Sequence, residues 1–125
     1  GLLMLTADYR IGAEGEARYG LNESAIGMVL PPFGMDLARF KLNNQYLDAS
    51  VVGAELYLPE PAVRVGYLDE ITTAENLEAR TLEKAKTLQE LDAKAFAGNK
   101  KVIRGAMIEK IRADLETGAG LKVGA

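Results

Sequence analysis

The 125-residue chain contains no cysteine, no histidine and no tryptophan. These absences exclude disulfides, Cys/His zinc sites, haem ligation by histidine, Ser-His-Asp triads and cysteine nucleophiles. Any chemistry must therefore use carboxylates, lysine, tyrosine, hydroxyl groups or backbone amides.

Long apolar runs and a surplus of positive charge are also missing. No apolar run reaches the length of a membrane span, and residues 1–5 are too short, and lack the basic flank, for a signal peptide. We therefore expect a cytoplasmic protein with no membrane partner. The 15 basic and 18 acidic residues give a net charge of -3, so we expect no nucleic-acid partner.

The composition that remains, 48% hydrophobic and 26% charged, is that of a single globular domain. Two regions of different periodicity meet near residue 73. Residues 1–72 are rich in glycine and β-branched side chains, which predicts short strands and helices in a β-α-β order. Residues 73–125 are dense in Ala, Leu, Glu and Lys, which predicts helices.

Turn residues set the predicted limits of the elements in the first region. Pro31-Pro32 favours a helix start, and Gly66 supplies a left-handed cap that ends another helix. The predicted elements are a helical turn at 2–5, extended segments at 8–12, 16–20, 25–29 and 67–71, and helices at 34–42 (with Leu37, Ala38 and Phe40 inside), 44–54 and 62–65.

The second region predicts two helices within residues 73–118, with Thr73 as N-cap and a break near Asp92 or Gly98, followed by a frayed tail. Two apolar stripes follow the helical period: Leu77, Leu82, Ala85, Leu88 and Leu91, then Phe96, Ile103, Met107, Ile111 and Leu115. Such stripes usually belong to the protein's own core. Packing against another subunit is the alternative, because the first region offers little sheet to cover.

Glu23 is the strongest candidate for acid–base chemistry. Most other carboxylates lie in the helical region beside Lys or Arg, as on a solvated helix face. Glu23 lies between apolar segments without an adjacent basic residue, and apolar surroundings favour proton transfer near neutral pH by desolvating the carboxylate. The alternative is that Glu23 caps a strand or faces water at a turn.

Two weaker candidates have ordinary structural explanations. Asp8 follows an apolar turn and precedes a strand, a position suited to satisfying buried turn amides. Lys100, Lys101 and Arg104 form a small basic cluster that is either a solvated helix face or a contact for a phosphate group.

Three stretches of the chain match the pattern of a known family. Residues 2–13 (LLMLTADYRIGA) are similar to an apolar helix ending Ala-Cys-Asp that precedes a strand such as Ile-Arg-Ile-Ala. Residues 17–28 (ARYGLNESAIGM) are similar to Phe-Gly-x-Pro-Glu and Leu-Gly-x-x-Pro segments, and residues 54–71 to Ala-x-x-Ala-x-x-x-Gly-Leu-Val-Asp-x-Val. In order and spacing, the chain resembles the crotonase (enoyl-CoA hydratase/isomerase) superfamily.

The resemblance implies an α/β fold in two parts. Residues 1–72 would form the C-terminal part of a crotonase-like spiral of ββα units, and residues 73–125 the C-terminal trimerisation helices, which also help complete an acyl-CoA site. The implied partners are an acyl-CoA thioester substrate and further copies of the chain, as a trimer or a dimer of trimers. Neither a metal nor a separate cofactor is implied, since coenzyme A arrives as part of the substrate.

The resemblance also assigns site residues. Glu23 matches the glutamate of the Pro-Glu motif and would be the catalytic acid/base. The second glutamate of the hydratases aligns with Leu2, which cannot transfer a proton, so hydration is in doubt and double-bond isomerisation stays open. Gly1 would be the last residue of the family's glycine-rich loop, with an oxyanion-binding amide at or just before it, so Gly1 and Leu2 are predicted to contact the substrate.

The departures from the family pattern concern the acyl pocket and the start of the chain. Pro31 to Gly34 replace a proline and several glycines, which predicts that Phe33 and Met35 line an altered pocket. The family's N-terminal half would precede Gly1, and we expect it as a partner that covers Leu2, Leu3 and Leu5.

The function expected from the resemblance is that of an acyl-CoA enzyme of the enoyl-CoA hydratase/isomerase type. A carboxylate would transfer protons at the acyl α and β carbons while two backbone amides stabilise the thioester enolate. The alternative is a catalytically inactive crotonase-like fragment that acts only in assembly or binding. The absence of a second carboxylate favours that alternative.

Overall fold

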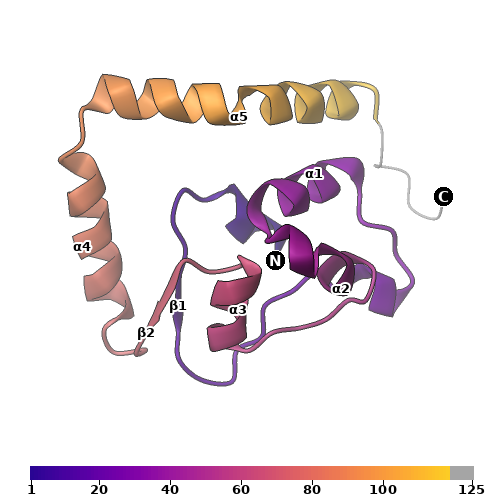
Figure 1. Ribbon diagram of the computed structural model, residues 1–125, viewed down its shortest axis with the longest axis horizontal. Helices are drawn as coiled ribbons and strands as arrows, with labels where there is room; N and C mark the ends of the chain where they lie inside the picture. The colour runs from indigo at the N-terminus through magenta and orange to yellow at the C-terminus, as the bar shows by residue number, and fades with distance from the viewer. Residues whose placement is uncertain (119–125) are drawn as a thin grey trace.

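The computed structural model describes residues 1–118 (Figure 1). The chain opens with the 3-10 helix η1 (Leu2–Thr6), which confirms the predicted helical turn. Leu5 of η1 is fully buried, whereas Leu3 is 85% exposed. The expectation that Leu5 needs a partner to cover it is therefore wrong, because Leu5 is part of the core formed within the described residues.

A parallel pair of strands connects the beginning and the end of the first region. Strand β1 (Ile11–Ala13) pairs with β2 (Glu70–Thr72), with Ile11 opposite Glu70 and Ala13 opposite Thr72. The helices α1 (Pro32–Lys41), α2 (Leu47–Val51) and α3 (Pro59–Val65) lie between them in sequence, which is the predicted β-α-β order. Each strand has three residues, fewer than the predicted segments 8–12 and 67–71. Tyr67 and Leu68 belong to the turn before β2, where both side chains are buried.

Two of the predicted extended segments differ in the structure. The segment 16–20 contributes a single antiparallel bridge, in which Tyr19 and Tyr57 exchange backbone hydrogen bonds of 2.8 Å. The segment 25–29 is not extended, because the 3-10 helix η2 (Glu23–Ile26) turns the chain and Gly27 ends it at φ 74°. A left-handed glycine reverses the chain direction, which a continuous strand cannot do.

The predicted helix limits of the first region are closer to the observed ones. Helix α1 buries Leu37 and Ala38 as predicted, but Phe40 is only half-buried. The predicted helix 44–54 is divided into the 3-10 helix η3 (Asn44–Tyr46) and α2. Gly66 ends α3 at φ 107°, and a Cβ there would approach the carbonyl oxygen of Lys41 to 2.7 Å, so the predicted glycine cap is confirmed.

The core lies between η1, α1, α3 and the turn before β2 (Figure 1). The largest of its fully buried side chains are Tyr67, Leu5 and Leu68. The buried apolar set is Leu5, Leu21, Leu30, Leu37, Ala38, Leu42, Val51, Tyr57, Ala62, Val65, Tyr67 and Leu68. All of these residues belong to the first region.

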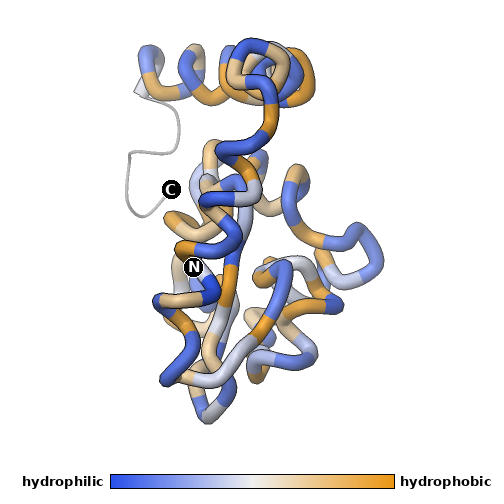
Figure 2. Tube along the Cα trace, turned by 90° about the vertical axis from the view of Figure 1, so that its left-hand side faces the viewer, coloured by the Kyte–Doolittle hydropathy of each residue, from blue (hydrophilic) through white to orange (hydrophobic). Residues whose placement is uncertain are grey.

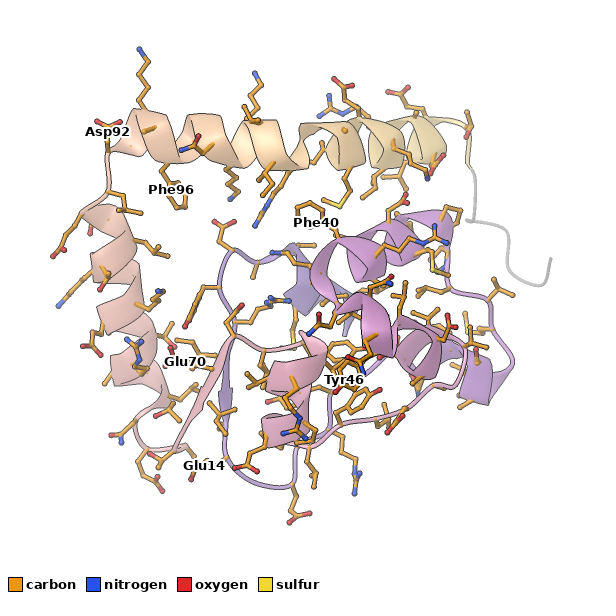
Figure 3. The ribbon with its side chains drawn as sticks, viewed as in Figure 1. Glu14, Phe40, Tyr46, Glu70, Asp92 and Phe96 are labelled. Carbon is orange, nitrogen blue, oxygen red and sulfur yellow. The ribbon has the colours of Figure 1, made fainter. Side chains whose placement is uncertain are left out.

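The second region forms two helices that flank this core. Helices α4 (Leu77–Gln89) and α5 (Ala93–Glu116) meet at a sharp corner at Asp92 (Figures 1 and 3). The predicted break at Asp92 is confirmed, and its carboxylate accepts a hydrogen bond of 2.8 Å from the Ala95 amide as N-cap. Thr73 is not the N-cap of α4, which is Asn76, but its hydroxyl accepts a 3.3 Å hydrogen bond from the Asn76 amide.

Helices α4 and α5 bury none of their residues completely. Met107 and Ile111 pack against the core, and Phe96 points from α5 toward the corner with α4 (Figure 3). By contrast, Leu82, Leu91 and Ile103 are 54%, 52% and 69% exposed. The chain's own core therefore explains only part of the predicted stripes, and Figure 2 shows apolar positions along α5.

No helix within residues 1–118 is both long enough and apolar enough to cross a membrane. The prediction of a frayed tail concerns residues 119–125, which lie outside the described residues.

Candidate active site

Glu23 is the first residue of η2 and lies beside the core. Asn22 precedes it, and the Glu23 carbonyl accepts a 2.9 Å hydrogen bond from the Met28 amide. The hydroxyl of Ser24 donates a 3.1 Å hydrogen bond to the Val51 carbonyl and so attaches η2 to α2. These contacts fix the backbone from which the Glu23 side chain projects.

The carboxylate of Glu23 is unusual among the acidic groups of the described residues. Its Oε2 atom is buried and has no hydrogen-bond partner in the structure, although the residue as a whole is only half-buried. A buried polar atom without a partner is costly and is concentrated at functional sites. Glu23 is thus neither a simple strand cap nor a fully solvated turn residue.

The apolar residues that follow Glu23 in the chain do not surround it as the sequence suggests. Ile26, Met28 and Val29, which follow it in the chain, are 61%, 46% and 80% exposed. The buried residues close to it in the chain are Leu21 and Leu30. The segment 25–29 therefore faces outward and does not enclose Glu23 as the sequence pattern suggested.

Tyr67 is a second buried polar group that the sequence analysis missed. Its side chain is completely buried, and its hydroxyl has no hydrogen-bond partner among the described residues. Burial raises the pKa of Tyr67 to about 12, and the negative charge of nearby Glu23 contributes in the same direction. The signal in the sequence is that Tyr67 stands where the family motif has the leucine of Gly-Leu-Val-Asp.

Gly1 lies close to the segment that leads into Glu23. A Cβ on Gly1 would collide with the carbonyl oxygen of Gly20 and lie 3.1 Å from a methyl group of Leu21. The first residue of the chain thus contacts Leu21, which precedes the predicted catalytic residue Glu23 by two positions. The structure brings Gly1 and the approach to Glu23 together, as one site would require.

Leu2 and Phe33 both line an apolar groove with a volume of about 780 Å³. The groove runs between η1, α1 and α5, and its apolar wall includes Leu2, Leu3, Leu5, Phe33, Leu37, Met107, Ile108, Ile111 and Leu115. Neither Met35 nor Glu23 is among the residues that line it. Met35 packs against the core, as Leu2 and Phe33 also do, but does not line the groove. The predicted substrate contacts Leu2 and Phe33 are therefore brought together, and Met35 is placed elsewhere.

Positive side chains lie along this groove. Lys41 donates a 3.0 Å hydrogen bond to the Ala7 carbonyl, and burial lowers the pKa of Lys41, with the nearby positive charges of Arg104 and Arg10 acting in the same direction. Arg104 and Arg112 line the groove from α5, together with the acidic Glu116. An apolar groove with basic side chains suits a ligand with an apolar chain and negative charge.

Asp8 and the basic cluster pair with one another. Asp8 lies 2.8 Å from Lys100 Nζ and 2.8 Å from Arg104 Nη1, so it connects the first region to α5. The hydrogen bond from Lys100 is the main cause that lowers the pKa of Asp8. No turn amide donates to Asp8 in the described residues, so the predicted turn role is wrong and the ion pairs explain this residue. Lys101 is exposed.

Within residues 1–118, no three carboxylates lie close enough together to hold a metal ion.

Comparison with known proteins decides the family. The family model described as enoyl-CoA hydratase/isomerase matches residues 1–121. The chain belongs to the enoyl-CoA hydratase/isomerase family. The resemblance inferred from the sequence is thereby confirmed.

Solved structures of this family share the fold. An enoyl-CoA hydratase/isomerase family protein from Pseudomonas syringae is 35% identical, with a TM-score of 0.89 over 94% of this chain and 51% of that chain. The enoyl-CoA hydratase EchA3 from Mycobacterium ulcerans Agy99 is 27% identical, with a TM-score of 0.87 over 92% of this chain and 50% of that chain. The chain thus has the crotonase fold and spans about half the length of these structures.

A curated relative is the mitochondrial enoyl-CoA delta isomerase 1 of Mus musculus. It is 29% identical over 80 residues, which are 63% of this chain and 28% of that protein. The human mitochondrial delta3-delta2-enoyl-CoA isomerase, 23% identical with a TM-score of 0.85 over 90% of this chain and 44% of that chain, shares the fold.

Proposed function

We propose that this chain of the enoyl-CoA hydratase/isomerase family transfers protons on acyl-CoA thioesters, with Glu23 as the proton carrier. The observation that carries the proposal is the buried Oε2 atom of Glu23, which has no protein hydrogen-bond partner in the described residues. A carboxylate oxygen without a partner is free to accept a proton from a bound substrate. The position of Glu23 in the family's motif supports the same role.

Of the two reactions named for the family, we propose double-bond isomerisation. One carboxylate is sufficient for it: the carboxylate takes a proton from the carbon next to the thioester carbonyl, the double bond moves through the enolate, and the same carboxyl group returns the proton farther along the acyl chain. The hydratases that the sequence resembles use a second glutamate, and Leu2 aligns with that position in this chain. The mouse relative is itself named an enoyl-CoA isomerase.

The substrate would meet the chain at two places. An amide at or before Gly1 would bind the thioester oxygen, and the contact of Gly1 with residues 20 and 21, shortly before Glu23 in the chain, supports this assignment. Leu2 and Phe33 would contact the substrate from the apolar groove. Coenzyme A would arrive as part of the substrate, and the rest of its site would come from the part of the family fold that precedes Gly1.

The second candidate function is assembly or binding without catalysis. It is favoured by the exposure of apolar side chains along α4 and α5. In that case the chain would bind acyl-CoA or a further polypeptide without turnover.

The test is an assay of the purified protein against 2-enoyl-CoA and 3-enoyl-CoA substrates, with the intact mass of the same sample. Isomerase activity is expected on the 3-enoyl substrate. The variant Glu23→Gln keeps the shape of the side chain but cannot accept the proton, so turnover should fall by a factor of at least about 100. Its affinity for acyl-CoA, measured by calorimetry, should stay within about twofold of the original.

Glu14→Gln is the matched control, since Glu14 is an exposed glutamate in the turn after β1. Its turnover should equal that of the unmodified protein. Unchanged turnover in Glu23→Gln would remove Glu23 from the mechanism. Acyl-CoA binding with no turnover in the unmodified protein would favour the second candidate function.

A further inference from the structure

Lys41 brings an amine to the apolar groove between η1, α1 and α5. It is the last residue of α1, and it lines the groove together with Arg104, Arg112 and Glu116. None of the other lysines within residues 1–118 lines that groove. Three basic side chains and one acidic one suit a ligand with an apolar chain and negatively charged groups, such as a fatty acyl-CoA. A ligand in this groove would thus lie beside a primary amine.

The Lys41 amine has no counter-charge in the described part of the chain. Its Nζ atom donates a 3.0 Å hydrogen bond to the Ala7 carbonyl and lies 5.7 Å from the centroid of the Phe40 ring. No carboxylate of residues 1–118 lies within ion-pair distance of it. Lys100 and Lys110, by contrast, form ion pairs of 2.8 and 2.7 Å with aspartates. The ammonium form of Lys41 is therefore less stabilised than that of the paired lysines.

The surroundings of Lys41 favour its neutral form. Burial is the main cause that lowers the pKa of Lys41, and the positive charges of Arg104 and Arg10 lower it further. The carboxylates of Asp69 and Asp8 act in the opposite direction, with smaller effects. A lysine that is partly desolvated and close to other cations is an activated nucleophile, because only the neutral amine carries a lone pair for attack. The groove therefore combines space for an apolar chain with a reactive amine.

We propose that Lys41 is an acylation site, whose Nζ atom accepts the acyl group of a fatty acyl-CoA thioester that binds with its chain in the groove. The neutral amine attacks the thioester carbonyl carbon, a carbon–nitrogen bond forms, and the carbon–sulfur bond breaks. The sulfur leaves with the bonding electron pair and takes up the proton that the nitrogen loses, so the products are an amide on Lys41 and free coenzyme A. The inference rests on the proposed function only in that acyl-CoA binds to this chain.

The test uses octanoyl-CoA, whose saturated chain has no double bond to isomerise. The purified protein is incubated with it at about pH 8 and digested, and the label on each lysine is measured by mass spectrometry. Lys41 should carry at least about tenfold more label than Lys101, an exposed lysine on α5. The ratio should fall at least about tenfold with acetyl-CoA, because each buried methylene of the longer chain strengthens binding about fourfold.

Two variants serve as a matched pair. Lys41→Arg keeps a positive charge and a hydrogen-bond donor but stays protonated, so the octanoyl label on the intact protein should fall at least about tenfold. Lys101→Arg should keep the label of the unmodified protein. Equal labelling of Lys41 and Lys101, equal labelling by both thioesters, or no labelling of Lys41 would overturn the proposal.

The pH dependence gives a readout that accessibility alone would not change. Because its pKa is lowered, Lys41 becomes fully neutral at a lower pH than an exposed lysine. As the pH rises from about 7 to about 11, the rate of acylation at Lys41 should therefore level off at a lower pH than the rate at Lys101. The same pH profile at both lysines would contradict the activation of Lys41 and overturn the proposal.

The use of octanoyl-CoA separates this inference from the proposed function. Labelling of Lys41 in a protein without isomerase turnover would reject the proposed function and leave the acylation site standing. Isomerase turnover without labelling of Lys41 would reject the acylation site alone. The variant Glu23→Gln should keep the label, since Glu23 does not line the groove and takes no part in the transfer.

Discussion

Arg10 shows how one side chain connects two segments that lie far apart in sequence. It is only 7% exposed, and its guanidinium forms hydrogen bonds of 3.0 and 3.2 Å with the Asp69 carboxylate and one of 2.8 Å with the Gly66 carbonyl. The Asp69 carboxylate also accepts from the Arg10 amide at 2.8 Å. This cluster holds the end of α3 and the turn carrying Tyr67 against the start of β1.

Replacing Arg10 with methionine should therefore destabilise the fold strongly. The variant keeps much of the volume but leaves the Asp69 carboxylate without its cation and the Gly66 carbonyl without its donor, a loss of about 3 kcal/mol. Urea unfolding followed by circular dichroism measures it. The exposed Arg39 is the control, and Arg39→Met should change the free energy of unfolding by less than about 0.5 kcal/mol. Equal effects of the two substitutions would show that the buried pair has no special role.

The two residues of the candidate site differ in how far the sequence predicts them. Glu23 is recognisable because it has no basic neighbour in the chain and because it matches a family motif. Tyr67 was predicted only as part of a strand, since its burial depends on contacts with Leu21 and Tyr57, which lie 46 and 10 positions away. Contacts across such distances leave no local pattern in the sequence.

Among the elements, those limited by local rules are predicted best. Pro31-Pro32 and Gly66 set the limits of α1 and α3 by backbone geometry alone, and Asp92 starts α5 as a capping residue. The segment 25–29 was predicted wrongly because its apolar residues fit a strand equally well. Only the left-handed turn at Gly27 and the contacts of η2 with α2 show otherwise.

The attachment of α4 and α5 to the core depends on ion pairs and should weaken in acid. Hydrogen bonds from Arg80, and then from Tyr9, lower the pKa of Glu70 from its usual 4.5, and Lys100 lowers that of Asp8 from 3.8. A carboxyl group whose pKa is lower in the folded protein adds stability above its unfolded pKa. That stability is lost as the pH falls through the folded value.

We therefore expect α4 and α5 to loosen before the core as the pH falls below about 4. Thermal unfolding between about pH 6 and about pH 3, followed by helical circular dichroism and by tyrosine fluorescence, should show the two signals separating in acid. In Asp8→Asn combined with Glu70→Gln, the separation should already exist at neutral pH and depend little on pH. Coincident transitions at every pH would contradict this assignment.

At the scale of the whole molecule, the chain leaves a large apolar surface on its flanking helices. Along α5, Val102 and Ile103 are 84% and 69% exposed, and Ile108 and Leu115 are 43% and 45% exposed. Neither α4 nor α5 contains a fully buried residue. Apolar side chains at helical spacing on a well-formed helix are typical of a surface that another polypeptide covers.

The family resemblance predicts that the covering polypeptide is a second and third copy of the chain. Light scattering after size exclusion should then give the mass of a trimer or of a dimer of trimers. Ile103→Asp places a charge on the exposed stripe and should lower that mass, because burying an unpaired carboxylate in a subunit interface is unfavourable. Lys94→Asp, at an exposed position in the first turn of the same helix, is the control and should keep the oligomer intact. A monomeric mass for the unmodified protein at all concentrations would show that these helices do not join copies of the chain, and a heterologous partner would then have to cover them.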